Sequence, residues 1–249
     1  MRRFVGVCVC LLALVGCKKS SDQEDITPLI VITSPDNPPF EFKDTAQGGD
    51  EVIGFDMDMA QKLSEHLGRP VKIMEADFSA IIPALQSGRA DMAISTLSPT
   101  PERCKSVDFS DPYYQQDVAF LVLEGCPITS PRGLENKVLG VQMGSTHENT
   151  GQALIKKIPA LSVVSLNKGG ELVQELKNKR IDAILTETCT AQRIAAATPG
   201  LKVVPLEIEG EKLAIAFPKG SPWVKVVNEK LKNMQKDLKT LTVKWFKTE

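Results

Sequence analysis

Hydroxyl side chains and one arginine gather between Ser95 and Arg103, directly after a short apolar segment at residues 90–95. Two prolines in this stretch favour extended or turned backbone, and the hydroxyl of Ser98 or Thr100 can cap a short helix that begins at the arginine. A guanidinium binds both oxygens of a carboxylate, and hydroxyls and free N–H groups complete the hydrogen bonding. The stretch therefore has the chemistry of a carboxylate-binding site. From residue types alone, a capped surface loop with an ion pair is an equally good interpretation.

A second charged group closes a similar segment later in the chain. Residues 179–187 read K-R-I-D-A-I-L-T-E, and residues 88–96 read G-R-A-D-M-A-I-S-T. In both, an aspartate leads into a short apolar strand, and Thr96 and Glu187 stand five residues beyond Asp91 and Asp182. Ligands bind outside the carboxyl ends of strands in open α/β sheets, so two facing lobes of this kind would share one cleft. Coincidence between two ordinary helix–strand junctions is the alternative.

The elements that must position these groups alternate between strand and helix in both halves of the chain. In the first half, strand, helix, strand and helix are predicted in turn at residues 29–32, 55–67, 71–74 and 78–85. The second half repeats this order with a strand, a helix and a strand at residues 138–142, 148–158 and 161–166. Apolar segments at 118–123 and 213–217 are predicted to cross between the halves, which returns a final helix at 223–246 to the first. The pattern favours an α/β fold.

Length and composition are those of a soluble globular protein. The chain has 249 residues, with 42% hydrophobic and 24% charged residues, which is enough for two lobes of about 100 residues each. The net charge of −1 gives no indication of a nucleic-acid partner. With two histidines and no Cys-x-x-Cys pair, neither a structural metal nor a cofactor is expected.

The first residues differ in kind from the rest. Two arginines precede an apolar run at 4–15 that is too short to span a bilayer but suits the core of a signal peptide. The run ends in L-V-G-C at 14–17, which resembles the lipobox of bacterial lipoproteins. That resemblance implies a signal peptide at 1–16, a lipid on Cys17, a polar tether at 17–27, and anchoring to a membrane. An ordinary secretory signal cut elsewhere is the alternative.

Three further thiols remain after such cleavage, at Cys104, Cys126 and Cys189. Because three is an odd number, at least one thiol stays free or pairs between molecules. A disulfide between Cys104 and Cys126 is conceivable in an oxidising compartment, and the sequence does not decide whether it forms.

Three ordered motifs carry a family resemblance that covers nearly the whole mature chain. They are S-T-L-S-P-T-P-E-R at 95–103 followed by V-D-F-S-D-P-Y-Y at 107–114, G-F-D-M-D at 54–58, and I-A-F-P-K-G-S at 215–221 with K-W-F at 244–246. They resemble the signatures of bacterial solute-binding family 3, the polar amino-acid-binding proteins of ABC importers. The resemblance implies a periplasmic-binding-protein type II fold. In that α/β fold two lobes, each an open sheet flanked by helices, are joined by two hinge strands.

The resemblance also implies a ligand site. Arg103 matches the arginine that holds the ligand's α-carboxylate, and Glu187 matches an acidic residue, most often aspartate in the family, that receives the α-ammonium. Hydroxyls from both lobes are expected to add hydrogen bonds, and three further side chains to line the ligand's side chain; the full set comprises Ser95, Thr96, Ser98, Ser145, Thr146, Phe78, Asn37 and Gln142. For Phe78, a place in the core is an equally good interpretation.

The first loop departs from the family pattern. Asn37 stands where many relatives have an aromatic residue, and Ser34 where several have aspartate. A cation-binding carboxylate is therefore missing unless Asp36 or Glu41 takes that role, so glutamine or a similar neutral amino acid is favoured over arginine. His147 is expected to be a solvated loop residue.

The resemblance implies a monomer that passes a free amino acid to an ABC permease and its ATPase. The predicted boundaries give lobe 1 residues 28–120 and 215–249, and lobe 2 residues 121–214. An enzyme of the cyclohexadienyl or arogenate dehydratase type on the same fold is the alternative function. An enzyme would need a general acid or base near the ligand. Glu187 is the one obvious candidate, and binding of the ligand's α-ammonium already explains it, so no enzyme is expected.

Overall fold

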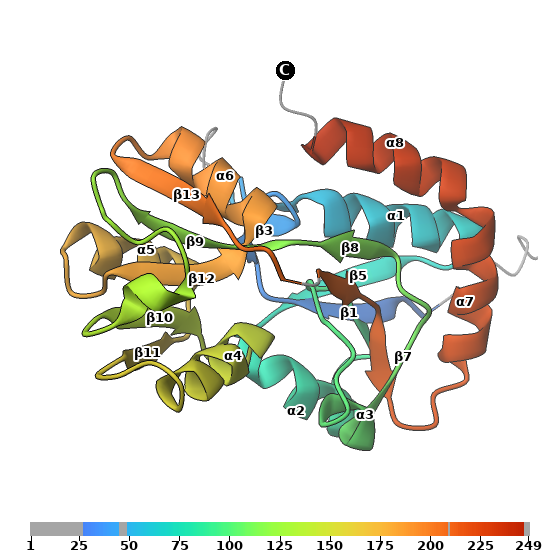
Figure 1. Ribbon diagram of the computed structural model, residues 1–249. Helices are drawn as coiled ribbons and strands as arrows, with labels where there is room; N and C mark the ends of the chain where they lie inside the picture. Colours follow the sequence, from blue (N-terminus) through green and yellow to red (C-terminus); the bar gives the residue numbers. More distant parts are fainter. Residues whose placement is uncertain (1–26, 45–48, 209, 247–249) are drawn as a thin grey trace, which may run out of the picture.

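Two five-stranded sheets, each placed between helices, organise the described chain (Figure 1). The computed structural model describes residues 27–44, 49–208 and 210–246. The predicted signal peptide, Cys17 and all but the last residue of the predicted tether lie outside these residues. Within them, no helix is long and apolar enough to cross a membrane.

The first sheet has the strand order β5–β1–β6–β15–β7. Its strands are β1 (Leu29–Thr33), β5 (Val71–Glu75), β6 (Met92–Ala93), β7 (Val107–Phe109) and β15 (Ala216–Pro218). Strand β1 runs parallel to β5 and β6, whereas β15 is antiparallel to both of its neighbours. Through β15 the last part of the chain returns to the first sheet, as the family resemblance implied.

Helices bury apolar residues against both faces of this sheet. Phe55, Met59 and Leu63 of α1 (Phe55–Leu67) pack in one core with α7 (Trp223–Asn233) and α8 (Gln235–Phe246). The opposite face is covered by the 3-10 turn η1 (Phe78–Ala80) and by α2 (Ile81–Gln86). Helix α1 ends at Gly68, as predicted, in a left-handed conformation that suits glycine.

The prediction of one final helix at 223–246 is wrong. The chain turns at Met234, which is fully buried, and continues as the separate helix α8. The turn lets both α7 and α8 pack on α1. At the end of α8 the ring of Phe246 completes an aromatic cluster, with its centroid 4.8 to 5.1 Å from those of Phe40, Phe55 and Tyr114.

The second sheet repeats the plan of the first in the order β11–β10–β12–β9–β13. Its strands are β9 (Val118–Leu123), β10 (Val138–Gln142), β11 (Ser162–Leu166), β12 (Ala183–Glu187) and β13 (Leu201–Pro205). Here β10 is parallel to β11 and β12, and β9 is antiparallel to β12 and β13. Its helical elements are η2 (Pro131–Leu134), α4 (Thr146–Ile155), α5 (Gly169–Lys177) and α6 (Thr188–Ala197).

Asp91 and Asp182, the two aspartates of the repeated sequence pattern, accept equivalent hydrogen bonds in the two sheets. Asp91 accepts a hydrogen bond of 2.7 Å from the backbone N–H of Ile30 in β1. Asp182 accepts one of 2.9 Å from the N–H of Val138 in β10. Each carboxylate thus satisfies a donor of the neighbouring strand, and the echo in the sequence reflects a structural equivalence.

The chain crosses between the sheets at β8 (Tyr114–Gln116) and β14 (Glu211–Leu213), which pair antiparallel. The crossings lie a few residues earlier than the predicted segments at 118–123 and 213–217. The whole of β9 belongs to the second sheet, so the predicted lobe boundary between residues 120 and 121 falls inside a strand. A small sheet of β2 (Asp36–Asn37), β3 (Glu41–Lys43) and β4 (Val52–Ile53) stands beside α1.

The G-F-D-M-D motif links three parts of the first lobe. Phe55 is fully buried in the core, Asp56 accepts a hydrogen bond from the backbone N–H of Thr96, and Asp58 accepts from Lys244 and Trp245 of α8. Gly54 precedes the helix with a φ of 133°, and a Cβ there would lie 2.0 Å from the carbonyl oxygen of Phe40. The glycine is therefore required by a close backbone approach.

Gly54→Ala should lower the free energy of unfolding by about 3 kcal/mol or more, because the added methyl group cannot be placed without moving backbone. Gly170→Ala is the matched control. A Cβ at Gly170 meets no heavy atom within 4 Å, so this helical substitution should leave stability unchanged or raise it by about 1 kcal/mol. Urea denaturation followed by tryptophan fluorescence measures both variants, and equal midpoints would contradict the role given to Gly54.

Candidate functional site

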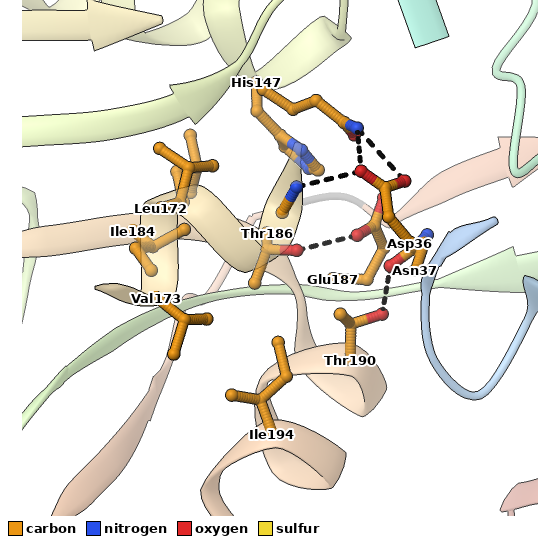
Figure 2. A pocket seen from close by; sticks show the side chains of 13 residues that line it. Asp36, Asn37, His147, Leu172, Val173, Ile184, Thr186, Glu187, Thr190 and Ile194 are labelled. Carbon is orange, nitrogen blue, oxygen red and sulfur yellow. Dashed lines mark hydrogen bonds between the residues drawn. The ribbon is translucent and has the colours of Figure 1, made fainter. Parts of the chain in front are cut away.

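A pocket lies where the carboxyl ends of strands from the two sheets meet (Figure 2). Its polar wall combines Asp36 and Asn37, which follow β1, with Glu187 at the end of β12 and Gln142 at the end of β10. Leu172, Val173, Ile184 and Ile194 form an apolar wall. The cavity itself is small, with a volume of about 30 Å³, whereas the empty space among the lining atoms, which includes open solvent, is about 420 Å³. This is the position at which open α/β sheets bind small molecules.

Asp36 is the carboxylate through which the first lobe reaches into the pocket. It accepts hydrogen bonds from Nε2 of Gln142 at 3.0 Å and from the N–H of Gly169 at 2.9 Å, both in the second lobe. The hydroxyl of Ser34 donates a third, at 3.1 Å. Burial raises the pKa of Asp36 above its usual value, and these hydrogen bonds oppose the rise. Lys168 is nearby, but its ammonium pairs with Asp77 at 2.5 Å.

Glu187 comes from the second lobe and lies on the same polar side of the pocket as Asp36 and Asn37 (Figure 2). Glu187 is 8% exposed. Its carboxylate accepts hydrogen bonds from Nε2 of Gln116 at 3.2 Å and from the hydroxyl of Thr186 at 2.9 Å. Both partners are neutral. A buried carboxylate with neutral donors only is an electrostatically favourable neighbour for an ammonium group.

Asn37 connects the two lobes through buried hydroxyls. Its Nδ2 donates to Oγ1 of Thr96 at 3.0 Å, and its Oδ1 accepts from the hydroxyl of Thr190 at 2.7 Å. Thr96 belongs to the first lobe and has a φ of 46°, an uncommon value for a residue with a branched side chain. The sequence analysis placed Asn37 and Thr96 at the site, and the structure brings them into direct contact.

The groups expected to bind a carboxylate lie together around Glu211. The hydroxyls of Ser98 and Thr146 donate to the same oxygen, Oε2 of Glu211, at 2.6 and 2.8 Å. Arg103 begins α3 (Arg103–Ser106), and its guanidinium donates to the carbonyl oxygens of Ser98 and Gly144 at 2.9 and 3.0 Å. Burial lowers the pKa of Arg103, and the charge of Glu211 opposes this. Hydroxyls from both lobes therefore already converge on one carboxylate beside the arginine.

Three other predicted site residues have local roles in the structure. The hydroxyl of Ser145 caps α4, since it accepts from the N–H of Glu148 and donates to the carbonyl of Gln142. Ser95 donates to Oε1 of Glu41 and accepts from the backbone N–H of Ser34, and it does not line the pocket. Phe78 is buried in the core of the first lobe, and its ring lies 5.5 Å from the guanidinium carbon of Arg103.

Sequence reasoning missed or misplaced several residues of this region. His147 was expected in solvent, which is wrong: it is 5% exposed and lines the pocket from the first turn of α4. Glu41 was one candidate partner for a cationic ligand, but it is fully buried beneath Thr96. Thr186, Thr190 and Glu211 gave no motif signal, because their contacts depend on how the lobes meet.

The cysteines and the metal-binding side chains add nothing to the site. Cys104, Cys126 and Cys189 are free thiols, so the disulfide left open by the sequence does not form in this structure. Within the described ranges, no group of three or more His, Cys, Asp or Glu side chains is arranged to hold a metal ion.

Comparison with known proteins places the chain in a family. Residues 29–248 match the family model of the bacterial extracellular solute-binding proteins, family 3. The chain is 34% identical over 251 residues to the arginine-binding extracellular protein ArtP of Bacillus subtilis (strain 168), covering 98% of this chain and 96% of that one. It is 35% identical over 217 residues to a probable histidine-binding protein of Campylobacter jejuni, covering 84% and 82%.

Solved structures agree with these sequence comparisons. An ancestral arginine-binding protein bound to arginine has a TM-score of 0.83 and 38% identity, covering 88% of this chain and 98% of that one. The chain therefore belongs to the bacterial extracellular solute-binding proteins, family 3. The fold class and the family implied by the sequence motifs are confirmed. The chain is a binding protein and not an enzyme.

Proposed function

We propose that this chain captures an amino acid with a cationic side chain between its lobes and delivers it to an ABC importer. The observation that carries the proposal is the charge of the pocket. Thirteen residues line it, and they include two carboxylates, Asp36 and Glu187, but no lysine or arginine. A pocket with this charge favours a ligand that brings two positive groups.

The α-carboxylate of such a ligand has matching groups on both lobes. Ser98 and Thr146 donate to one carboxylate oxygen of Glu211, and Arg103 is close enough for the charge of Glu211 to affect its pKa, so their arrangement suits carboxylate binding. We assign the α-ammonium to Glu187. The ligand's α-carboxylate would then compete with Glu211 for the same hydroxyls.

Asp36 decides between a neutral and a cationic side chain. The sequence favoured glutamine because the loop after β1 offered no obvious carboxylate for a cation. Asp36 lines the pocket, and its hydrogen-bond donors, an amide, a backbone N–H and a hydroxyl, are all neutral. The nearby charge of Lys168 favours the ionised form of Asp36, but this ammonium forms its ion pair with Asp77. Arginine, the ligand named for ArtP, fits this pocket better than glutamine does.

Membrane attachment and partners complete the proposal. The lipobox-like residues 14–17 support a lipid anchor on Cys17, outside the cytoplasm, with the polar residues after it as a tether. Delivery requires a permease and its ATPase. We propose a monomer, since a two-lobed protein forms its complete ligand site within one chain.

Asp36→Asn should weaken L-arginine binding by about 2–5 kcal/mol and leave L-glutamine binding nearly unchanged, because the amide cannot neutralise a guanidinium. Glu187→Gln should weaken the binding of L-arginine and of L-glutamine by similar amounts, because both ligands have an α-ammonium group. Isothermal titration calorimetry of the mature protein measures these affinities.

Asp77→Asn is the control for this pair, since Asp77 is also an aspartate that pairs with a residue of the other lobe, Lys168, but does not line the pocket. Its effect on arginine should stay below about 1 kcal/mol. Because burial raises the pKa of Asp36, arginine affinity should fall on acidification at a higher pH than an ordinary aspartate would give. Equal losses of arginine and glutamine in Asp36→Asn would refute the proposed specificity.

Opposite charge changes around the carboxylate position should have opposite effects. Arg103→Ala should weaken the binding of every amino acid ligand by about 2–5 kcal/mol, because the ligand's α-carboxylate loses its cationic partner. Glu211→Gln should strengthen binding by about 1 kcal/mol, because the competing negative charge is gone. Circular dichroism confirms folding of each variant. Near-normal affinity of Arg103→Ala, or weaker binding by Glu211→Gln, would reject this assignment.

Cys17→Ser should abolish incorporation of labelled fatty acid and leave the protein soluble or unprocessed. The measurement is metabolic labelling in a bacterial host, followed by fractionation into membrane and soluble protein. Cys8→Ser, within the apolar run of the signal peptide, is the control and should be labelled normally. Persistent labelling of Cys17→Ser would show that the lipid is attached elsewhere.

A further inference from the structure

Two carboxyl side chains lie buried together beneath Thr96, outside the pocket. Glu41 comes from β3 and Asp56 from the first turn of α1, and both residues are fully buried. Oε1 of Glu41 accepts from the hydroxyls of Ser95 and Thr96 at 3.0 and 3.2 Å. Asp56 accepts from the N–H of Thr96 at 3.0 Å and from the hydroxyl of Tyr113 at 3.0 and 3.1 Å.

One oxygen of this pair has no donor. Among the described residues, Oε2 of Glu41 receives no hydrogen bond, although it is completely buried. An ionised carboxylate with such an oxygen would be costly, and a second negative charge on Asp56 would raise the cost further. A proton on Glu41 that is donated to Asp56 removes both difficulties, because it satisfies the free oxygen and leaves one charge on the pair.

Electrostatics support the same distribution of charge. Burial and the charge of Asp56 raise the pKa of Glu41 well above its usual value. Burial also raises the pKa of Asp56, to about 6, against hydrogen bonds from Thr96, Tyr113 and Glu41. Both directions favour a state in which Glu41 holds a proton and Asp56 carries the charge. The other titratable groups facing the pair are the phenol of Tyr113 and the carboxylate of Asp36, and neither supplies a positive charge.

We propose that Glu41 and Asp56 share one proton, and that this acid–carboxylate pair positions Thr96 for ligand binding. The proposal rests on the proposed function in one respect, the placing of Thr96 at the ligand site. The pair holds Thr96 at two points, since Asp56 accepts from its N–H and Glu41 accepts from its hydroxyl. Asn37 adds a third by donating to the same hydroxyl. Such fixation is needed because Thr96 has a positive φ, a conformation that persists only when its surroundings enforce it.

The shared proton has a defined effect on stability. A carboxyl group whose pKa is raised by folding binds more protons in the folded state than in the unfolded state. Its contribution is therefore complete below the ordinary pKa near 4.5 and is lost as the pH rises through the raised value. In that window the folding constant of the wild type should fall, relative to a variant without the titration, by up to about tenfold for each pH unit.

Glu41→Gln is the decisive variant. Its amide oxygen can accept from Ser95 and Thr96, and its NH₂ can donate to Asp56 without any titratable proton. Asp56→Asn removes the negative charge that receives the N–H of Thr96. Glu51→Gln is the control, since Glu51 is exposed in the same lobe.

Two measurements without ligand test the pair. The infrared spectrum of the wild type at neutral pH should contain the carbonyl band of a protonated carboxylic acid, absent in Glu41→Gln and retained in Glu51→Gln. The backbone amide signal of Thr96 in the NMR spectrum should stay in place in Glu41→Gln and shift in Asp56→Asn. Absence of the band in the wild type, or its persistence in Glu41→Gln, would overturn the shared proton. An unmoved Thr96 signal in Asp56→Asn would overturn the positioning role.

Titration with L-arginine across the pH range separates this inference from the proposed function. We expect arginine binding by the wild type to weaken as the pH rises through the raised pKa of Glu41, because loss of the shared proton leaves two buried negative charges beside Thr96. Glu41→Gln should bind within about threefold of the wild type at neutral pH and should lack this decline at high pH. Asp56→Asn should bind at least about tenfold more weakly. If Glu41→Gln keeps the pH dependence of the wild type, the inference is wrong. If the wild type does not bind arginine but the band and the Thr96 signal behave as stated, the proposed specificity fails and the pair stands.

Discussion

The hydrogen bond from the N–H of Thr96 to the buried carboxylate of Asp56 joins the binding region to the core of the first lobe. Asp56 stands in the first turn of α1, two residues before Asp58, which accepts from the last helix of the chain. One short motif therefore sets the position of the strand end after β6 and of the C-terminal helix at the same time. Gly54, the first residue of the motif, allows the close approach to the backbone of Phe40 that this arrangement requires.

Several polar groups connect the two lobes. Asp36, Asn37 and Arg103 of the first lobe bind backbone or side-chain groups of the second, and Glu211 in the crossing strand accepts from both lobes. Polar contacts of this kind are directional and exchange readily with water, so their free energy is modest compared with that of a hydrophobic core. A ligand with complementary charges can therefore shift the balance between lobe arrangements.

The sequence predicted those features that depend on local pattern. Helix α1 and its end at Gly68, the strands that flank the aspartates Asp91 and Asp182, and the return of the chain through β15 follow from periodicity or from ordered motifs. Burial of His147 and Glu41, the break at Met234 and the contacts of Glu211 could not be predicted in this way. Each depends on surfaces far apart in the sequence, whose approach is determined by tertiary packing.

The pairing of β8 with β14 has a consequence for how the molecule is divided. The second sheet lies entirely between these two adjacent strands, so the second lobe is an insertion whose entry and exit points are neighbours. The first lobe contains both described ends of the chain, the aromatic cluster and the arginine. The second lobe contributes Gln142, Glu187 and Thr190 to the pocket. Changes within this one inserted module can thus alter its side of the cleft, while the first lobe, with Asp36 and Arg103, keeps its own packing.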